Sequence, residues 1–277
     1  MSADLQPGVS VRIARGVRRL IAPNPGMMTG PGTNTYLVGG REVAVIDPGP
    51  ALDVHVDAII AAAGGTIRWI LVTHTHRDHS PAARMLAAAT GAELIGRAAP
   101  AGPHQDDTFL PDREPGDGEA LAVGEFRLSA LHTPGHASNH VCFLLEADGL
   151  LFTGDHIMSG STVVIDPPDG NMRQYLASLG RLRNEAVSAI LPGHGDVLDQ
   201  PHAVIEWIVD HRLQREAKVV EKLARHPDSS LSELVTHVYD DVDSRLHRIA
   251  ERSLLAHLLK LEEEGRARRA SEHWRVT

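Results

Sequence analysis

The sequence predicts an α/β layered fold that is followed by a small helical domain. Strand-like and helix-like segments alternate between residues 35 and 95, as they do in layered α/β folds. From about residue 201 the pattern changes to helices with apolar stripes. A chain of 277 residues is long enough for one large or two ordinary domains. We therefore expect a layered domain over residues 1–204 and a helical domain over residues 205–277.

The first part of the chain consists of short strands, two helices and one long loop. Alternating apolar positions in residues 9–22 predict a hairpin or two edge strands. Residues 22–33 are rich in proline and glycine, and a loop of this length in a compact domain is usually functional. Periodicity predicts the other elements, which are strands at residues 35–38, 43–47, 66–73 and 93–95 and helices at residues 51–63 and 81–89.

Strands dominate the remainder of the layered domain. Residues 97–119 hold many proline, glycine and aspartate residues, so we expect an irregular excursion there. After residue 124 we expect strands at residues 126–132, 140–146, 150–153 and 187–191 and a helix at residues 171–183. The single cysteine, Cys142, falls in one of these apolar strands and is expected to be a buried thiol rather than a nucleophile.

The tail has the element order of a winged-helix module. Helical periodicity begins near residue 201, and Ser230 with Glu233 forms a capping box for a second helix. A third helix is predicted at residues 244–264, and residues 266–276 are expected to form a small hairpin. The predicted helical domain is therefore winged-helix-like.

Composition excludes several classes of function. The net charge of −9 disfavours a general polyanion binder, and residues 205–277 are nearly neutral, with 13 basic and 14 acidic side chains. The sequence contains no signal-peptide pattern and no run of about 18 apolar residues. One cysteine cannot form an internal disulfide, which is typical of a reducing compartment. We expect a cytoplasmic protein with no membrane partner.

The motif His-x-His-x-Asp-His follows the predicted strand at residues 66–73. His74 and His76 are two residues apart, so an extended backbone directs both side chains to the same side. Asp78 and His79 come where the chain turns into the next helix, and they can face a second point. Imidazoles suit zinc, iron and related ions, and a carboxylate suits a second ion. The motif therefore predicts a metal site.

Three further turns repeat this arrangement. His136, Asp155 and His194 each come after a predicted strand and stand beside a glycine, which leaves room for the backbone. In layered α/β folds, sites assemble where strands end. We therefore expect these three side chains to join those of the motif.

Together these motifs resemble those of the metallo-β-lactamase superfamily, over residues from about 10 to 200. The resemblance implies that residues 1–204 form a catalytic domain with a four-layer αββα sandwich. It also implies two metal ions with one bridging carboxylate. The implied ligands are His74, His76 and His136 for the first ion, Asp78, His79 and His194 for the second, and Asp155 as the bridge. For Asp47, which matches an acidic position of the superfamily, we expect a structural role.

A closer resemblance is to the beta-lactamase-like protein 2 group. Its motifs look like residues 32–38, 133–136 and 152–155 and the tail around residues 211–212 and 254–262. Members of this group carry a winged-helix-like domain and are zinc-dependent hydrolases; one is a single-strand endoribonuclease, and more distant relatives are thioesterases. The resemblance thus implies two divalent ions, with zinc expected. Iron and manganese are alternatives because the same ligands serve all three metals.

The chemistry of such a site follows from its ligands. Two ions about 3.5–4 Å apart share a water, lower its pKa towards about 7 and polarise a carbonyl or phosphoryl oxygen. Asp78 and Asp155 lower the net charge of the site and orient the hydroxide. His140 begins an apolar strand four residues after His136; it either lines the site or is a hydrogen-bonded strand-end histidine. The catalytic candidates are therefore Asp78 and His140.

Two substrates and one other class of function remain open. A dinuclear hydrolase that cleaves ester-type bonds would act on single-stranded RNA or on a small acyl or thioester substrate. The alternative is a nucleic-acid-binding regulator with a structural metal site, and β-lactam hydrolysis is expected only as a weak side activity. Arg245, Arg248 and Arg252 share a helix face, but neighbouring acidic residues favour an ion-paired face. We expect the tail to shape the substrate cleft or to form a homodimer contact.

Overall fold

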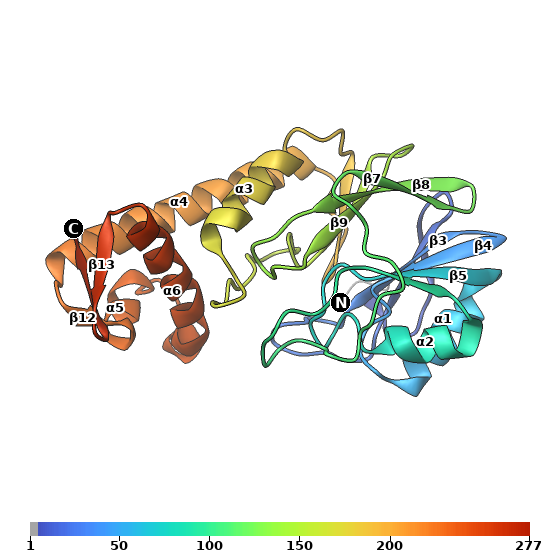
Figure 1. Ribbon diagram of the computed structural model, residues 1–277, viewed down its shortest axis with the longest axis horizontal. Coiled ribbons are helices and arrows are strands. Elements are labelled where there is room, and N and C mark those ends of the chain that lie inside the picture. Colours follow the sequence, from blue (N-terminus) through green and yellow to red (C-terminus); the bar gives the residue numbers. More distant parts are fainter. Residues whose placement is uncertain (1–4) are drawn as a thin grey trace. The chain divides into compact units, whose positions relative to one another are not determined.

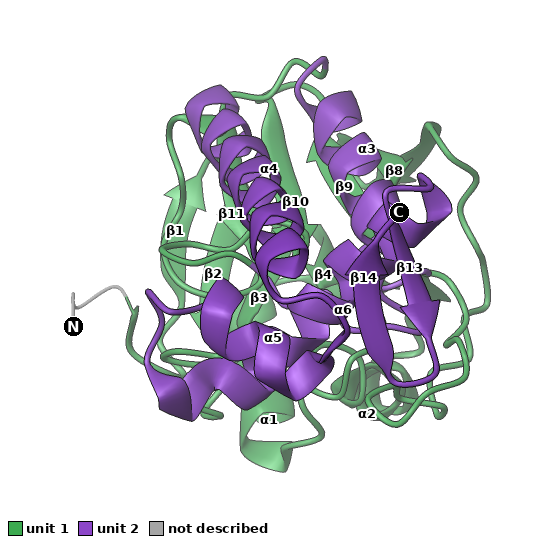
Figure 2. Ribbon diagram, turned by 90° about the vertical axis from the view of Figure 1, so that its left-hand side faces the viewer, with its two compact units in different colours: residues 1–133, 139–162, 185–201 green, residues 134–138, 163–184, 202–277 purple. Residues whose placement is uncertain are grey.

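The chain folds into two compact units, and the computed structural model describes residues 5–277. The first unit extends to residue 133 and includes residues 139–162 and 185–201 (Figure 2). The second unit comprises residues 134–138, 163–184 and 202–277. The units therefore do not meet at one point of the sequence, and a domain boundary between residues 204 and 205 stays a prediction.

The first sheet of the first unit has six strands in the order of the chain. They are β1 (Val11–Ala14), β2 (Val17–Ile21), β3 (Asn34–Gly39), β4 (Glu42–Ile46), β5 (Thr66–Leu71) and β6 (Glu93–Ile95). Strands β1 to β4 pair antiparallel, whereas β4, β5 and β6 are parallel. Parallel neighbours need crossover connections, and these contain α1 (Asp53–Ala63) and α2 (Ala82–Thr90). Both helices lie on the same side of this sheet (Figure 1).

The second sheet of the first unit has five strands in the order β11-β10-β9-β8-β7. They are β7 (Glu119–Val123), β8 (Phe126–His132), β9 (Val141–Leu145), β10 (Leu150–Gly154) and β11 (Ala189–Pro192). Strands β7 to β10 pair antiparallel, and β10 pairs in parallel with β11. The parallel pair places the carboxyl ends of β10 and β11 side by side.

Two apolar clusters hold the first unit together. Leu71 of β5 packs in one buried cluster with Phe143 and Phe152 of the second sheet, so the two sheets form a sandwich. Its neighbour Ile70 points to the other face and packs in a second cluster with Ile59 of α1. Strand β5 is therefore apolar on both faces, as expected for a sheet that is covered on both sides.

The second unit contains four helices and a small sheet among the residues that the structure describes. The helices are α3 (Met172–Leu182), α4 (Pro201–Arg225), α5 (Leu231–Val238) and α6 (His247–Glu263), and the 3-10 helix η2 (Ser244–Leu246) precedes α6. The sheet has the order β12 (Ser229–Ser230), β14 (His273–Val276), β13 (Ala267–Ala270). Val219 of α4, Leu234 of α5, Leu258 of α6 and Trp274 of β14 share a buried core, so the helices and the wing fold together.

The structure confirms the predicted α/β sandwich and the helical tail with its wing. It also contains two strands that the sequence analysis does not predict. Strand β7 lies at the end of the expected irregular excursion and is recognisable only by its pairing with β8, while β12 adds a third strand to the wing. Cys142 is buried, as predicted. Within residues 5–277, no helix is both long and apolar enough to cross a membrane.

Candidate metal centre

Strand β5 leads directly into the turn that carries the histidine motif. The strand ends at Leu71, and the amides of His79 and Ser80 donate to the carbonyl oxygen of His76 at 2.9 and 3.3 Å. His74 and His79 are buried in this turn. Helix α2 begins directly after it. The motif therefore lies at the carboxyl end of a parallel strand, where layered folds assemble their sites.

Four side chains of the first unit converge on one point, and they are Asp78, His79, Asp155 and His194. The two aspartates face the two imidazoles. Nε2 of His194 lies 3.2 Å from Oδ2 of Asp78 and 3.3 Å from Oδ1 of Asp155. Nε2 of His79 lies 3.5 and 3.3 Å from the same two oxygens. The four candidate ligand atoms all lie within 4.8 Å of one another.

Hydrogen bonds at Nδ1 orient both imidazoles of this group. Nδ1 of His79 donates to Oδ2 of Asp47 at 2.9 Å, and Nδ1 of His194 donates to the carbonyl oxygen of Gly32 at 3.2 Å. Because these oxygens can only accept, they leave Nε2 of each ring unprotonated and available to a metal ion. Asp47 also accepts from the amide and hydroxyl of Thr73 at 2.8 and 2.7 Å. It has the structural role expected of it.

The charges of this group favour a bound cation. Burial opposes charge on His79, but the carboxylates of Asp78, Asp155 and Asp47 raise its pKa well above the ordinary value. Burial also opposes charge on His194, but Asp155 above all raises its pKa to about 9. Burial works against the carboxylate of Asp155, yet His194 and His79 hold its pKa well below the usual range. The carboxylates therefore need positive charge, either from protons on the imidazoles or from a metal ion that replaces them.

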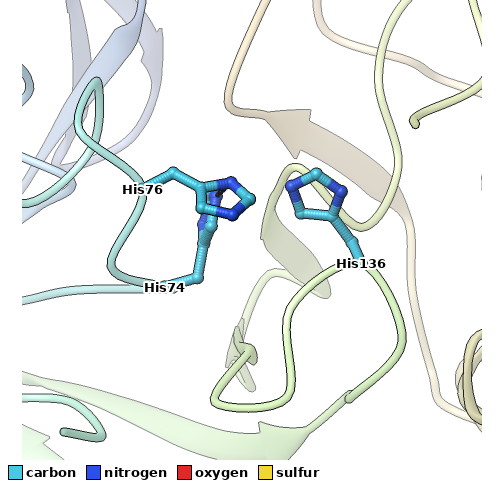
Figure 3. A group of neighbouring side chains, drawn as sticks. All are labelled: His74, His76 and His136. Atoms are coloured by element: carbon cyan, nitrogen blue, oxygen red, sulfur yellow. Dashed lines mark hydrogen bonds between the residues drawn. The ribbon is translucent and has the colours of Figure 1, made fainter. Parts of the chain in front are cut away.

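Three histidines form the other group of candidate ligands, and they are His74, His76 and His136. Nε2 of His74 lies 3.1 Å from Nδ1 of His76, and the ligand atoms of the three residues lie within 4.8 Å of one another. Figure 3 shows the ring of His136 turned towards the other two. Burial, followed by the neighbouring imidazoles of His79, His76 and His140, lowers the pKa of His74 well below its ordinary value. A neutral imidazole is the form that binds a metal ion.

Two glycines make room for the group of two aspartates and two histidines. Gly154 precedes Asp155 and has φ +45°, and a Cβ there would lie 2.3 Å from Oγ1 of Thr73. Gly193 precedes His194, and a Cβ there would lie 2.7 Å from Cε1 of His79 and 2.8 Å from Oδ1 of Asp155. Only glycine fits at these positions without a shift of the site.

This donor set fits two metal ions. Imidazole nitrogens with carboxylate oxygens bind zinc, iron and manganese. Nε2 of His79 is buried and has no hydrogen-bond partner within residues 5–277, as expected for an atom that coordinates an ion. All seven predicted ligands occur in the two groups. The assignment of each residue to a particular ion stays a prediction.

His140 supports the three-histidine group. Its ring is buried and stacks on that of His74, with centroids 5.0 Å apart and an interplanar angle of 27°. Its Nδ1 lies 3.0 Å from Oγ1 of Thr133. By contrast, the side chain of Asp78 is 29% exposed. The catalytic roles of His140 and Asp78 stay predictions.

Two residues that hold the motif turn have no counterpart in the sequence-based predictions. Asp106 accepts from the hydroxyl of Ser80 at 2.7 Å, and its amide donates to the carbonyl oxygen of Thr75 at 2.6 Å. Gln105 accepts from the hydroxyl of Thr75 at 2.6 Å. Both lie in the irregular segment 97–119. The length of this segment is the only sequence signal that its residues hold the motif turn, since long loops in compact domains are usually functional.

Comparison with known proteins identifies the family. The family described as "Metallo-beta-lactamase superfamily" matches residues 28–194, and the "Beta-lactamase associated winged helix domain" matches residues 230–274. A "Beta-lactamase-like protein 2 homolog" from Drosophila melanogaster is 30% identical over an alignment of 279 positions, which covers 95% of this chain and 93% of that protein. An "Atrochrysone carboxyl ACP thioesterase" from Aspergillus chevalieri is 37% identical over 224 residues, which cover 76% of this chain and 67% of that protein.

A solved structure shows the same fold. The crystal structure of a beta-lactamase domain protein from Burkholderia ambifaria has a TM-score of 0.83 and 23% sequence identity, covering 99% of this chain and 96% of that one. The fold defines a hydrolase of this superfamily, and the two ligand groups are compatible with a metal site. The chain belongs to the metallo-β-lactamase superfamily and carries a β-lactamase-associated winged-helix domain. The predicted fold and enzyme class are thereby confirmed.

Proposed function

We propose that this protein is a dinuclear metal-dependent hydrolase that cleaves an acyl thioester. The observation that carries the proposal is the pair of ligand groups, three histidines in one and two aspartates with two histidines in the other. The groups adjoin one another, since the ring centroids of His74 and His79 are 4.3 Å apart. Seven nitrogen and oxygen ligands suffice for two ions that share a carboxylate. We expect zinc in both positions, with Asp155 between them.

The protein's own residues prepare the site for this reaction. Two bound zinc ions would supply a hydroxide nucleophile at neutral pH and polarise the thioester carbonyl. Asp47 and the carbonyl oxygen of Gly32 hold His79 and His194 with Nε2 towards the site. Asp78, whose side chain is partly exposed, can accept a hydrogen bond from the attacking water and orient it. No serine or cysteine nucleophile is required.

Charge favours a thioester over RNA. The net charge of −9 repels a polyanion at long range. Two of the three arginines on the tail helix face are ion-paired, Arg245 with Asp243 at 2.6 Å and Arg252 with Asp166 at 3.2 Å. The relative from Aspergillus chevalieri is named an ACP thioesterase, and it shares 37% of its aligned residues with this chain. These observations support an acyl group in thioester linkage as the substrate.

A comparison of substrates tests the proposal. Zinc-loaded protein is assayed on a short acyl thioester and on a short single-stranded RNA, beside the variants His76→Ala and His202→Ala. We expect thioester cleavage that His76→Ala reduces by more than about 100-fold, since loss of a ligand exceeds the effect of an outer-shell change. His202 is an exposed histidine at the start of α4, so its variant should retain full activity.

Two results would contradict the proposal. Metal analysis that finds clearly less than one ion per chain would exclude the dinuclear hydrolase. Cleavage of RNA without cleavage of thioesters would keep the metal centre but replace the substrate class. Nucleic-acid binding that weakens steeply with salt and survives His76→Ala, without either activity, would instead indicate a regulator.

A further inference from the structure

The loop at residues 134–138, which carries His136, is held by other segments of the second unit. The carbonyl oxygen of Gly135 accepts from the amide of Asn171 at 2.8 Å. The carbonyl oxygen of Pro134 accepts from the hydroxyl of Ser178 in α3 at 2.8 Å. These contacts attach the first two residues of the loop to the N-terminal half of α3 and to Asn171, which precedes it.

Gly135 brings this loop into direct contact with α3. Its φ is +142°, and a Cβ at this position would lie 2.3 to 2.6 Å from the backbone and Cβ of Tyr175, which is fully buried. Because glycine has no Cβ, the backbone of the loop can lie directly against the start of the helix. The backbone around His136 is therefore fixed against α3.

The imidazole of His136 is fixed separately, by the segment 163–166. Its Nδ1 donates to the carbonyl oxygen of Val164 at 2.8 Å. Since a carbonyl oxygen can only accept, this bond sets the tautomer and directs Nε2 towards the metal position. The orientation of the ring thus depends on the orientation of the Val164 carbonyl.

Helices α4 and α6 hold that carbonyl in place. The amide of Ile165 donates to Oγ of Ser253 in α6 at 3.3 Å. The amide of Ile165 and the carbonyl of Val164 belong to one planar peptide group. Ser253 and His136 therefore bind opposite edges of the same plane.

Arg212 of α4 fixes the preceding peptide group. Its Nη2 donates to the carbonyl oxygen of Val163. The guanidinium group is almost fully buried and lies 5.4 Å from the ring centroid of Tyr175. Burying an arginine costs desolvation free energy, so its hydrogen bond to Val163 indicates a positioning task.

We propose that Arg212 and Ser253 are positioning residues for His136. They fix two consecutive peptide groups at residues 163–165, and the second of these groups orients the imidazole. The tail helices α4 and α6 therefore support a metal ligand, in addition to forming the winged-helix domain. The inference rests on the proposed function only in that His136 is taken as a metal ligand.

Hydrogen exchange of metal-free protein tests the mechanical part of this inference. We expect Arg212→Met to accelerate exchange in residues 134–138 and 163–166. Arg215→Met is the matched control, because Arg215 is also a buried arginine of α4 but donates to the carbonyl oxygen of Val238 and pairs with Asp241 at 2.7 Å. Its variant should loosen residues 238–241 and leave 134–138 unchanged. Equal acceleration of 134–138 in both variants would overturn the inference.

Zinc titration tests the consequence for the ligand. His136→Ala identifies the zinc-binding step that depends on this residue. We expect Arg212→Met and Ser253→Ala to weaken the same step by about tenfold, the lower end of the effects of outer-shell changes on metal affinity. Ser253→Thr keeps the hydroxyl and should retain wild-type affinity. In a His136→Ala background, neither substitution should have a further effect, because the ligand that they position is gone.

The outcomes separate this inference from the proposed function. Unchanged zinc steps in Arg212→Met and Ser253→Ala, or losses that persist in the His136→Ala background, would overturn the positioning role. If the wild-type chain bound no zinc, the proposed function would fail, and the exchange experiment would still decide whether α4 and α6 control the loop of His136.

Discussion

Asp47 fixes a candidate metal ligand although it lies outside both ligand groups. Its backbone has φ +49°, a left-handed conformation that aspartate tolerates better than most residues. Its carboxylate accepts from the amide and hydroxyl of Thr73 and from Nδ1 of His79. Its carbonyl oxygen accepts from the hydroxyl of Thr35 at 2.7 Å. One residue therefore fixes both the end of β4 and the ring of His79.

Replacement of Asp47 by asparagine should weaken zinc binding. Asparagine keeps the size and tolerates the left-handed backbone, but its amide nitrogen cannot accept a hydrogen bond and its charge is lost. We expect the affinity for one zinc ion to fall by about 10–100-fold, as measured by competition with a chromophoric chelator. Asp148→Asn, on an exposed turn, is the control. Unchanged affinity in Asp47→Asn would show that its carboxylate does not position His79.

A methyl group at position 193 should disrupt the same site. The new Cβ of Gly193→Ala would lie within 2.8 Å of His79 and Asp155 atoms, so both side chains must move. We expect a loss of about 1–3 kcal/mol in the free energy of unfolding, as for other overpacked sites, together with weaker zinc binding. In α3, Gly180→Ala meets no atom within 4 Å and should stabilise the helix by about 1 kcal/mol. Denaturant titration measures the free energy of unfolding of both variants. Equal changes in Gly193→Ala and Gly180→Ala would contradict the predicted overlap at position 193.

Elements with a strong internal pattern could be predicted, and those that depend on a partner could not. Strand β5 and the turn after it are defined by an apolar run followed by His74 to His79, so both the strand and the candidate ligands were accessible from sequence. Strand β7 has only five residues, and its pairing with β8 defines it. Gln105 is a polar residue whose contacts form with a distant segment, and no local pattern distinguishes it from an ordinary surface residue. Arg212 lies in a segment that resembles the family, but that resemblance does not indicate its hydrogen bond to Val163.

The capping box of α5 gives a prediction at this scale. Oγ of Ser230 accepts from the amide of Glu233 at 3.3 Å, and Oε2 of Glu233 accepts from the amide of Ser230 at 2.9 Å. Ser230→Ala should lower the free energy of unfolding by about 1 kcal/mol, the usual effect of losing such a cap. Chemical denaturation measures the loss. An exposed serine outside the helices, Ser161, provides a control substitution to alanine.

At the scale of the whole molecule, buried ionisable groups make stability depend on pH. Glu216 of α4 lies 2.8 Å from Nζ of Lys260 and 2.9 Å from Nη1 of Arg266. Burial opposes its charge, but the neighbouring side chains of His257 and Lys260 lower its pKa to about 2. Burial above all lowers the pKa of His257 from 6.5 to about 4. The folded chain therefore keeps His257 neutral at pH values where an unfolded chain would protonate it.

Acidification should destabilise the protein through His257. Its contribution to the free energy of unfolding is fully present above pH 6.5 and is lost as the pH falls towards about 4. Over that range only the unfolded state binds the proton. The lowered pKa corresponds to about 3 kcal/mol. Denaturation at several pH values should show a shallower decline between pH 6.5 and 4 for His257→Gln than for the wild type. Identical slopes would mean that His257 is protonated in the folded state.

The loop at residues 134–138 belongs to the second unit together with the tail, and this has a consequence for how such a chain can evolve. A module that occupies one continuous stretch can be gained, lost or exchanged by recombination at a single point. The second unit draws on three separate stretches, 134–138, 163–184 and 202–277. Recombination at residue 204 would combine His136 with a foreign α6 and with all but the first residues of a foreign α4. The winged-helix domain and the segments that hold His136 are therefore expected to be inherited together and to change in concert.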